Sequence, residues 1–558
     1  MYNHKSCLHM NLFLFKKNLL NFFIILFIFW FLYHFLYLFL IIGLNLPENG
    51  DEGLYLRLID HIIDGKRYLK DFISPTPTVF LYLFYPIDFF SDNYFLASRI
   101  FVAVISFFTF IILLFGLLKN DFFLSICILI LFSLLIITDH ELAYYPFEVR
   151  QWPFIFLFQT LLVTCFYFYF KTYKIIHIFT IGLLLGFLIS TRQIYSLVSP
   201  ILFVSLFLLE LKELNLKIFI KKYLYFFIGF IISSFYFFSI FFLEIDFALN
   251  LWFLIDQKEH FAREQFSVYN SLKLFFGLKN KFVEPIIAVS IIIYFYLIYE
   301  MIFFKNRFNV ICFIFTTLVI FLNFYGWSQS YHREVFFILL TYLILSDNKK
   351  KFYPILISLG VAVLLYYYNY ILNNNPYLKS NLLHFKRLEM SYNNNNFGKI
   401  DLYGYLNKEL NNYCNEDILA WDTRRGRLLS SNKKCKFHPK NNYDWFSTEF
   451  NQDVYSKSTV SKIFEIELKP IELVSKILFD LNLIIASDLD DFVQTIMLTI
   501  KRKALYDVLF YKLCDKNCNL MNTNYSYKIE NLEKIIRNHI LVYFNIEKKG
   551  DYTFFVRK

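Results

Sequence analysis

The stretch ENGDEGLYLRLIDHIIDGKRYLKDF, residues 48–72, directly follows the first long apolar segment of the chain. It carries six carboxylates and four basic residues, whereas residues 19–45 before it contain no Lys, Arg, Asp or Glu. An apolar segment of that length can cross a bilayer, so the charged stretch begins at a boundary between membrane and water. Two adjacent acids, Asp51 and Glu52, lie near its start.

The composition places the whole chain in the membrane class. Of its 558 residues, 57% are hydrophobic, 22% aromatic and only 18% charged, and the mean hydropathy is +0.45. A soluble protein has no use for so much apolar surface, so we expect a polytopic membrane protein in contact with membrane lipids. The net charge of +11 is explained by lysines beside membrane spans, and we expect no nucleic-acid partner.

Eleven apolar segments approach the ~20 residues that a membrane-spanning helix needs. They lie at residues 19–45, 97–118, 121–138, 152–170, 175–190, 193–210, 223–243, 285–304, 309–326, 333–346 and 353–372. The first is too long for the core of a signal peptide and is not followed by a small-residue cleavage site, so we expect it to be retained. The sequence therefore predicts a polytopic α-helical membrane protein with about eleven transmembrane helices.

The short connections on one side of this series are basic, and such loops are typical of the cytoplasmic face. Lys16 and Lys17 precede the first segment, which predicts a cytoplasmic N-terminus and, after eleven spans, an extracytoplasmic C-terminus. The polar connections at residues 46–94, 139–151, 244–284 and 327–332 then lie outside. We expect a multi-pass protein of the bacterial inner membrane whose chemistry takes place on the extracytoplasmic face.

The composition changes after residue 372. We divide the chain into a transmembrane domain at residues 1–372, an Asn-rich linker at 373–397 and an extracytoplasmic domain at 398–558. Short apolar runs in the last part predict a small α/β domain with about five strands. Four cysteines lie in it, and an oxidising compartment would allow them to form disulfides: Cys414, Cys435, Cys514 and Cys518.

The opening stretch has the pattern of a helix on the membrane surface. Leu54, Leu58 and Ile62 recur every four residues and form one apolar stripe, while charged residues occupy the opposite face. Asp51 is expected as the N-cap of this helix, and Gly65 as its C-cap. An acid at a helix N-terminus also has a purely structural interpretation, because it complements the helix dipole.

The motif Asp51-Glu52-x-x-Tyr55, followed by Gly65, Tyr68, Asp71-Phe72 and SPTPTVFLYLFYP, resembles the first extracytoplasmic loop of GT-C glycosyltransferases that use polyprenyl-phosphate donors. The similarity is to the protein O-mannosyltransferase and aminoarabinose transferase group. It implies a GT-C-like fold, a second surface helix after the prolines, and a glycosyltransferase activity.

The same resemblance implies roles for particular residues. In that group the first acid of the loop is the catalytic base, so Asp51 takes that role, and Glu52 and Tyr55 take supporting ones. Independently of the family, a lipid-phosphate donor already has a good leaving group, so transfer needs a base for the acceptor hydroxyl or amine and cations for the departing phosphate. Arg192, at the outer end of a predicted hairpin, is the favoured phosphate partner, although it can also be interpreted as a cation that reaches for the interface.

Further candidates lie in the other outer connections. Arg333 begins a span from the same side and can reach the same pocket, whereas His332 and Glu334 beside it are interpreted as interface residues. Glu148 and Arg150 match the second acidic loop of the family in position, with a structural ion pair as an equal alternative.

Two features leave metal use open. His260, with Arg263, is a candidate metal or acceptor contact in the loop at 244–284. Aminoarabinose transferases have Glu-Lys-Pro before the second surface helix, where this chain has Ser74-Pro75-Thr76-Pro77. A cation and a possible metal ligand are therefore missing, so the metal ligands are unknown and a divalent metal stays an open cofactor.

The sequence favours a lipid-linked donor, because it has no P-loop or Rossmann fingerprint and its cytoplasmic loops are too short for a nucleotide-sugar domain. The acceptor can be a lipid, a glycan or a protein. A transporter or flippase of lipid-linked sugars is the main alternative, and it would show midplane charges or inverted repeats. The third hypothesis is a non-catalytic membrane assembly factor.

Overall fold

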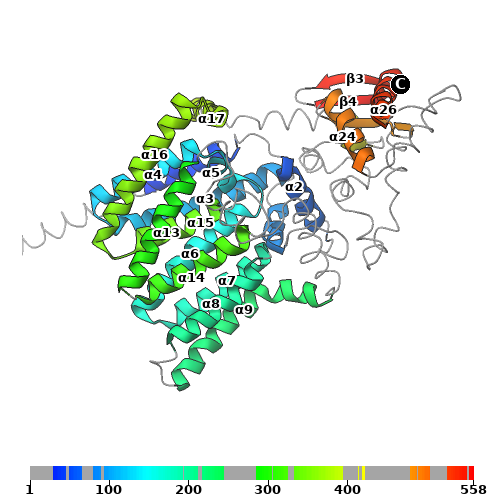
Figure 1. Ribbon diagram of the computed structural model, residues 1–558. Helices are drawn as coiled ribbons and strands as arrows, with labels where there is room; N and C mark the ends of the chain where they lie inside the picture. Colours follow the sequence, from blue (N-terminus) through cyan, green and yellow to red (C-terminus); the bar gives the residue numbers. More distant parts are fainter. Residues whose placement is uncertain are drawn as a thin grey trace, which may run out of the picture.

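The computed structural model describes residues 29–44, 50–63, 65, 79–89, 94–192, 194–210, 216–243, 284–304, 306–324, 332–393, 412–413, 418–420, 478–479, 481–486, 488–502, 525–549 and 552–558. Over these residues the chain forms a bundle of long helices and, close to its C-terminus, a small sheet with two helices (Figure 1). The mostly helical architecture confirms the predicted α-helical fold class.

Each apolar segment predicted from the sequence is helical where the structure describes it. The first forms a helix over Phe29–Leu44; the others form α3 (Tyr94–Leu118), α4 (Phe122–Thr138), α6 (Trp152–Thr172), α7 (Ile175–Thr191), α8 (Tyr195–Glu210), α9 (Leu216–Leu243), α13 (Pro285–Phe304), α14 (Arg307–Phe324), α15 (His332–Leu345) and α16 (Phe352–Tyr367). Among the described residues, four helices are long and apolar enough to cross a membrane: Leu96–Leu118, Trp152–Thr172, Pro285–Phe304 and Phe352–Leu372. Several of the others are shorter, so the number of eleven spans stays a prediction.

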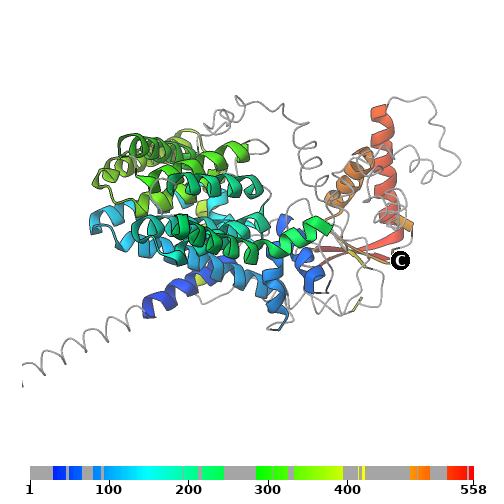
Figure 2. The same ribbon diagram turned by 90° about the horizontal axis from the view of Figure 1, so that it is seen from below.

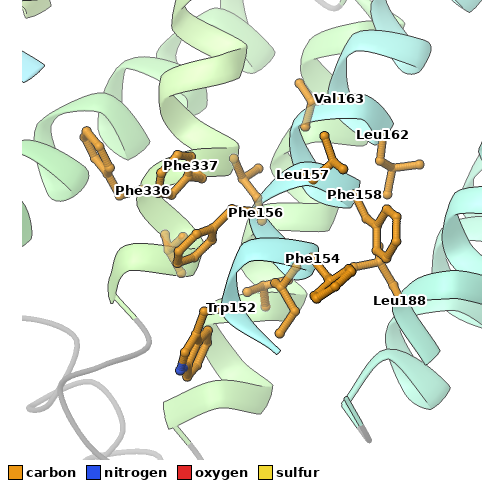
Figure 3. Close-up of a cluster of buried hydrophobic side chains, with 14 of the residues drawn as sticks. Trp152, Phe154, Phe156, Leu157, Phe158, Leu162, Val163, Leu188, Phe336 and Phe337 are labelled. Carbon is orange, nitrogen blue, oxygen red and sulfur yellow. The ribbon is translucent and has the colours of Figure 1, made fainter. Parts of the chain in front are cut away.

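Helices α6 and α15 form the centre of the bundle. Every residue of α15 is buried, and the ring of Phe156 on α6 stacks on that of Phe337 on α15, with centroids 4.3 Å apart. Figure 3 shows this core, in which the aromatic side chains of α6 point to both sides of the helix. By contrast, only 22% of the span that begins with α16 is buried, which suits a helix that faces lipid.

Helices α7 and α9 approach each other so closely that glycine is required between them. A Cβ atom on Gly182 would lie 2.1 Å from the carbonyl oxygen of Phe226, and a Cβ atom on Gly186 would lie 2.1 Å from Oγ of Ser233. Small residues four positions apart allow this kind of backbone contact between membrane helices. The two glycines therefore set how closely α7 packs on α9. Helix α7 ends at Thr191, and Arg192 is its C-cap residue.

The predicted surface helix is present as α2 (Gly50–Ile63). Its apolar stripe is buried, including Tyr55, Leu58 and Ile62, and it packs against a second apolar helix, the 3₁₀ helix η1 (Val79–Phe89). The ring of Tyr55 lies 6.2 Å from that of Phe80 on η1. The second helix implied by the family resemblance thus follows the first.

The two ends of α2 differ in how well the sequence predicted them. Gly65 has a φ of +78° and donates its N–H to the carbonyl of Ile62 over 3.0 Å, as expected of a helix C-cap. The expected N-cap at Asp51 is wrong, because α2 already begins at Gly50. Asp51 therefore lies in the first turn, where a carboxylate still complements the helix dipole.

The Asn-rich segment predicted as a linker contains a helix, α17 (Pro376–Asn393). Leu378, Asn381, His384 and Leu388 recur at helical spacing and are buried, and Nδ2 of Asn381 donates to the carbonyl of Ile137 over 3.2 Å. Because the asparagines dominate the composition, they hide this buried stripe. The segment therefore packs against α4 and the short helix α5 (His140–Tyr144).

Three further short helical elements lie between the long helices. They are η2 (Tyr145–Phe147), η5 (Lys349–Lys351) and the π-helical η6 (Tyr368–Leu372).

The described residues of the C-terminal part form a small sheet and helices, and the division of the chain into two domains stays a prediction. Its sheet has the order β1-β2-β4-β3, built from β1 (Ile418–Ala420), β2 (Leu483–Ala486), β3 (Phe544–Lys549) and β4 (Tyr552–Arg557). β1 runs parallel to β2, while β4 is antiparallel to both β2 and β3. Helices α24 (Leu489–Arg502) and α26 (Tyr525–Tyr543) bury their apolar faces with Ile484 and Phe555. The described residues thus hold four strands where about five were expected. The four cysteines of the tail lie outside the described residues.

Candidate active site

Ionisable side chains gather where several helices begin or end. Chain alternation places the start of α3, α6, α8, α13 and α15 and the end of α4 and α7 at the same end of the bundle as α2. Ion pairs join α2 to α3, and α15 to the ends of α4 and α7 and to Glu284 before α13. Hydrogen bonds join the start of α6 to α2, and Gln159 of α6 to α8 and α15. In Figure 1, α2 lies at the right-hand side of the bundle, and it keeps that side in the turned view of Figure 2. We call this side the polar end. It corresponds to the predicted extracytoplasmic side.

Glu52 and Arg99 form a buried ion pair between α2 and α3. Nε of Arg99 donates to Oε1 of Glu52 over 2.9 Å and Nη2 donates to Oε2 over 2.6 Å, with side-chain exposures of 3% for Glu52 and 2% for Arg99. Nη1 of Arg99 also donates to the carbonyls of Gly43 and Leu44, over 3.3 and 3.5 Å. The pair therefore joins the first turn of α2 to the last turn of the first apolar helix.

Two further contacts hold α2 in place. The backbone N–H of Val149 donates to Oε1 of Glu52 over 3.5 Å, and the hydroxyl of Tyr55 donates to Oε1 of Gln151. The segment between α5 and α6 is thus tied to α2 at two points one helical turn apart. Glu52, which was expected to support Asp51, contacts Arg99 and Val149, and Tyr55 contacts Gln151. Asp51 is next to Glu52 in the first turn of α2, whose backbone these contacts hold in place.

Arg192, the favoured phosphate cation, is the C-cap residue of α7 and is 6% exposed. Its Nη1 donates to Oε2 of Glu334, the third residue of α15, and its guanidinium carbon lies 5.3 Å from the ring centroid of Trp152. The residue is therefore buried and ion-paired in this structure, which differs from the alternative of a cation reaching for the interface.

Glu334 was interpreted as an interface residue with His332, and that interpretation is wrong. Both side chains are fully buried, because α15 passes through the middle of the bundle. Oε1 of Glu334 accepts from Nε2 of Gln159 over 3.1 Å and also from the hydroxyl of Tyr195. Glu334 thus lies at the centre of a polar cluster with Arg192, Tyr195 and Gln159, which come from α7, α8 and α6.

Arg333 pairs with a carboxylate other than Glu334. Its Nε and Nη2 donate to the two carboxylate oxygens of Asp139 over 3.0 and 2.6 Å, and Nη2 also donates to Glu284 over 3.2 Å. Asp139 in turn accepts the backbone N–H of Leu142 and so caps α5. Arg333 therefore joins the end of α4 and the start of α13 to α15, next to the Arg192 cluster along the same helix.

Glu148 and Arg150 form an ion pair, with Nη1 of Arg150 3.3 Å from Oε2 of Glu148. The Arg150 guanidinium carbon also lies 5.5 Å from the ring centroid of Tyr145, and that ring stacks on Trp152 with centroids 5.3 Å apart. Since Arg192 lies over Trp152, a pair of stacked rings connects the two arginines. The structural alternative given for Glu148 and Arg150 is therefore confirmed as a contact.

No metal site can be assembled from the described residues, which contain no group of three or more His, Cys, Asp or Glu side chains placed to hold an ion. His260 lies outside the described residues, as do Arg263 and the Ser-Pro-Thr-Pro segment. The metal ligands thus stay unknown.

Several residues of the polar end were not identified from the sequence. They are Arg99, Asp139, Gln159, Tyr195 and Glu284. Arg99 pairs with Glu52, and Asp139 and Glu284 pair with Arg333. Gln159 and Tyr195 pair with Glu334, which the sequence had not marked as a site residue either. Arg99 and Gln159 had a signal, because each is a polar residue inside a predicted apolar span, where such residues usually have a function. No signal in the sequence identifies their partners, because the paired residues lie 47 to 194 positions apart in the chain.

The sequence matches no family model, and no curated protein is similar to it. Among solved structures, the chain is similar to one described as the crystal structure of ArnT from Cupriavidus metallidurans bound to undecaprenyl phosphate. The two chains are 10% identical, and the similarity covers 83% of this chain and 93% of that chain with a TM-score of 0.49. At this identity and score, the similarity assigns neither a family nor an activity to this chain.

Proposed function

We propose that the chain is a membrane glycosyltransferase that moves a sugar from a polyprenyl-phosphate donor to an acceptor hydroxyl or amine on the extracytoplasmic face. Asp51 is the general base, and Arg192 binds the donor phosphate. The acceptor oxygen or nitrogen forms a bond to the anomeric carbon, while the bond from that carbon to the phosphate oxygen breaks. The acceptor proton passes to Asp51, and polyprenyl phosphate leaves with one more negative charge than it had as the donor.

The observation that carries this proposal is the buried pair of Glu52 and Arg99. It ties the first turn of α2, which contains Asp51, to the carbonyls of Gly43 and Leu44 at the end of the first apolar helix. A base for a lipid-borne donor is needed at this depth, because the phosphate of such a donor lies where the hydrocarbon region ends. A base that is held in one position also contributes more to catalysis than a mobile one.

The position of Arg192 supports its assigned role. It lies at the end of α7, at the same end of the bundle as α2, and in a site that excludes water, where a cation stabilises a departing phosphate far better than it does in water. Two more buried arginines, Arg99 and Arg333, lie at this end. Arg99 and Arg333 each contact both oxygens of their carboxylate partner. Arg192 contacts Glu334 at Oε2, while neutral donors occupy Oε1, so Arg192 is the one we assign to the donor.

The alternative of a transporter or flippase predicts charged residues near the middle of the membrane. In the described residues the buried arginines lie at helix ends, at the start of α3, the end of α7 and the start of α15. This distribution favours chemistry at one face over a path through the bundle.

The test is to incubate the purified protein with a panel of radiolabelled polyprenyl-phosphate sugars and a membrane extract, and to identify the labelled acceptor. Asp51→Asn should lower the transfer rate by about 10²- to 10⁴-fold, because an amide cannot accept the proton. Asp60→Asn on the same helix is the matched control and should keep the wild-type rate. Transport of the labelled lipid across a vesicle membrane without any transfer would replace this proposal with the flippase alternative.

A further inference from the structure

The positive charge of Arg192 is buried and neutralised in the structure. Its guanidinium group is paired with Glu334, and both side chains are buried, with exposures of 8% for Arg192 and 0% for Glu334. A phosphate that binds Arg192 therefore has to compete with a carboxylate that is already there. The affinity of the site for an anion depends on how easily Glu334 gives up this contact.

The surroundings of Glu334 suit such an exchange. A buried carboxylate that loses its cation is strongly destabilised unless other groups satisfy it. Glu334 has two neutral donors besides Arg192, since Nε2 of Gln159 donates to Oε1 over 3.1 Å and the Tyr195 hydroxyl donates to the same oxygen. The arginine contact is made at the other oxygen, Oε2. The two neutral donors would therefore stay in place while Arg192 turned to a new partner.

The neighbouring ion pairs are built differently. Arg99 is held by both oxygens of Glu52 and by two backbone carbonyls, and Arg333 by both oxygens of Asp139 and by Glu284. An anion at either arginine would have to displace several acceptors at once. Glu52 and Asp139 each accept a backbone N–H as well, at an oxygen that the arginine also contacts. In Glu334 the two neutral side-chain donors act at Oε1, whereas the contact with Arg192 is made at Oε2.

We propose that Glu334 is a resident counter-ion that occupies Arg192 between turnovers and yields it to the phosphate of the polyprenyl donor, while Tyr195 and Gln159 hold the released carboxylate. This inference rests on the proposed function. It also explains how the product leaves: the product is a phosphate monoester with a charge of about −1.5 to −2 at neutral pH, whereas the donor is a singly charged diester. The product would bind a bare arginine more tightly than the donor does, and the return of Glu334 to Arg192 promotes its release.

The test measures the binding of radiolabelled polyprenyl monophosphate to the purified full-length protein in lipid nanodiscs, with the neutral polyprenol as the control for the lipid chain. Glu334→Gln keeps the size of the side chain and removes its charge. It is expected to tighten binding of the monophosphate at least about tenfold, in line with measured coupling between close buried charges, and to lower kcat because product release slows. Binding of polyprenol should not change.

Two further variants separate the counter-ion role from a structural one. In the double variant Arg192→Gln with Glu334→Gln, the gain in affinity should vanish, because Glu334 acts only through Arg192. Tyr195→Phe removes one of the neutral donors, so the carboxylate should hold Arg192 more tightly and binding of the monophosphate should weaken. If Glu334→Gln does not fold, the affinity of Tyr195→Phe for the monophosphate decides between the two roles.

The possible outcomes are distinct. If the wild-type protein binds the monophosphate but Glu334→Gln binds it equally or less tightly, or if Tyr195→Phe binds it equally or more tightly, Glu334 is a structural partner and the inference is wrong. If the wild-type protein binds the monophosphate no better than polyprenol, the proposed function itself fails.

Discussion

Glu52→Gln is expected to destabilise the protein by about 3–5 kcal/mol, the usual range when one member of a buried ion pair is removed. The substitution keeps the size of the side chain and one acceptor oxygen. It removes the negative charge and the second oxygen, so Arg99 stays buried with its charge no longer neutralised. Desolvating an unpaired guanidinium group is the main source of the loss.

The geometry supports the upper part of that range. The two hydrogen bonds from Arg99 are 2.6 and 2.9 Å long, and side-chain exposures of 2% and 3% leave no water to replace the lost charge. The contacts from Arg99 to Gly43 and Leu44 tether the guanidinium group, so it cannot turn towards solvent. The pair formed by Arg537 and Asp490 provides a contrast, since Asp490 is 78% exposed and exposed pairs contribute only about 0–1 kcal/mol.

The assay is thermal unfolding of the purified protein in detergent, with the wild type, Glu52→Gln, Arg99→Gln and the double variant compared side by side. The double variant should lose less stability than the sum of the two single variants, because residues in direct contact are coupled. Asp490→Asn is the exposed control and should leave the midpoint almost unchanged. A midpoint for Glu52→Gln equal to that of Asp490→Asn, or strict additivity of the two single variants, would refute the reasoning.

Three further predictions address packing, protonation and orientation. Gly182→Leu should prevent stable folding, because its Cβ would lie 2.1 Å from the carbonyl oxygen of Phe226, whereas Gly360→Leu, where nothing lies within 4 Å of the added Cβ, should be tolerated; the yield of monodisperse protein on gel filtration measures both. Burial, together with the charge of nearby Lys119, lowers the pKa of Lys351 from 10.5 to about 8. The unfolded chain therefore binds more protons between pH 8 and 10.5, so stability should fall as the pH drops from 10.5 to 8, and Lys351→Met should flatten that dependence in thermal unfolding. A reporter fused after residue 372 should be active only if it works outside the cytoplasm; a cytoplasmic signal would contradict the predicted eleven spans.

The helices could be predicted from the sequence because their signals are local. About twenty consecutive apolar residues read as a membrane helix wherever they occur, and the spacing of Leu54, Leu58 and Ile62 gives an amphipathic helix without knowledge of its neighbours. The same local reasoning placed the cap at Gly65. It failed for α17, because the asparagine runs at 373–375 and 393–396, which flank the buried positions Leu378 and Leu388, outweighed the periodicity between them.

The sequence could predict single charged residues of the candidate site but not the partners that neutralise them. Single residues such as Arg192 and Arg333 could be selected because a charge at the edge of an apolar span is costly and therefore informative. Which carboxylate neutralises each of them depends on how helices far apart in the chain pack together. Glu334 and Arg333 are adjacent in sequence, yet Glu334 pairs with Arg192 and Arg333 pairs with Asp139, because successive helix positions face different neighbours.

The kind of cation differs between the two ends of the bundle. Among the described residues, the buried arginines are Arg99, Arg192 and Arg333, all at the polar end, whereas the buried lysines are Lys222 and Lys351, both at the other end. The rule that places positive residues on the cytoplasmic side counts lysine and arginine alike, so membrane orientation does not account for this separation. Stability does not account for it either, since well-packed apolar residues would often stabilise a bundle at least as well as buried ion pairs. Arginine differs from lysine in its planar fork of donors, which matches carboxylate and phosphate groups. Its confinement to the polar end matches the carboxylates that the three arginines contact there, on Glu52, Glu334 and Asp139. The same donor geometry suits the phosphate that we propose for Arg192.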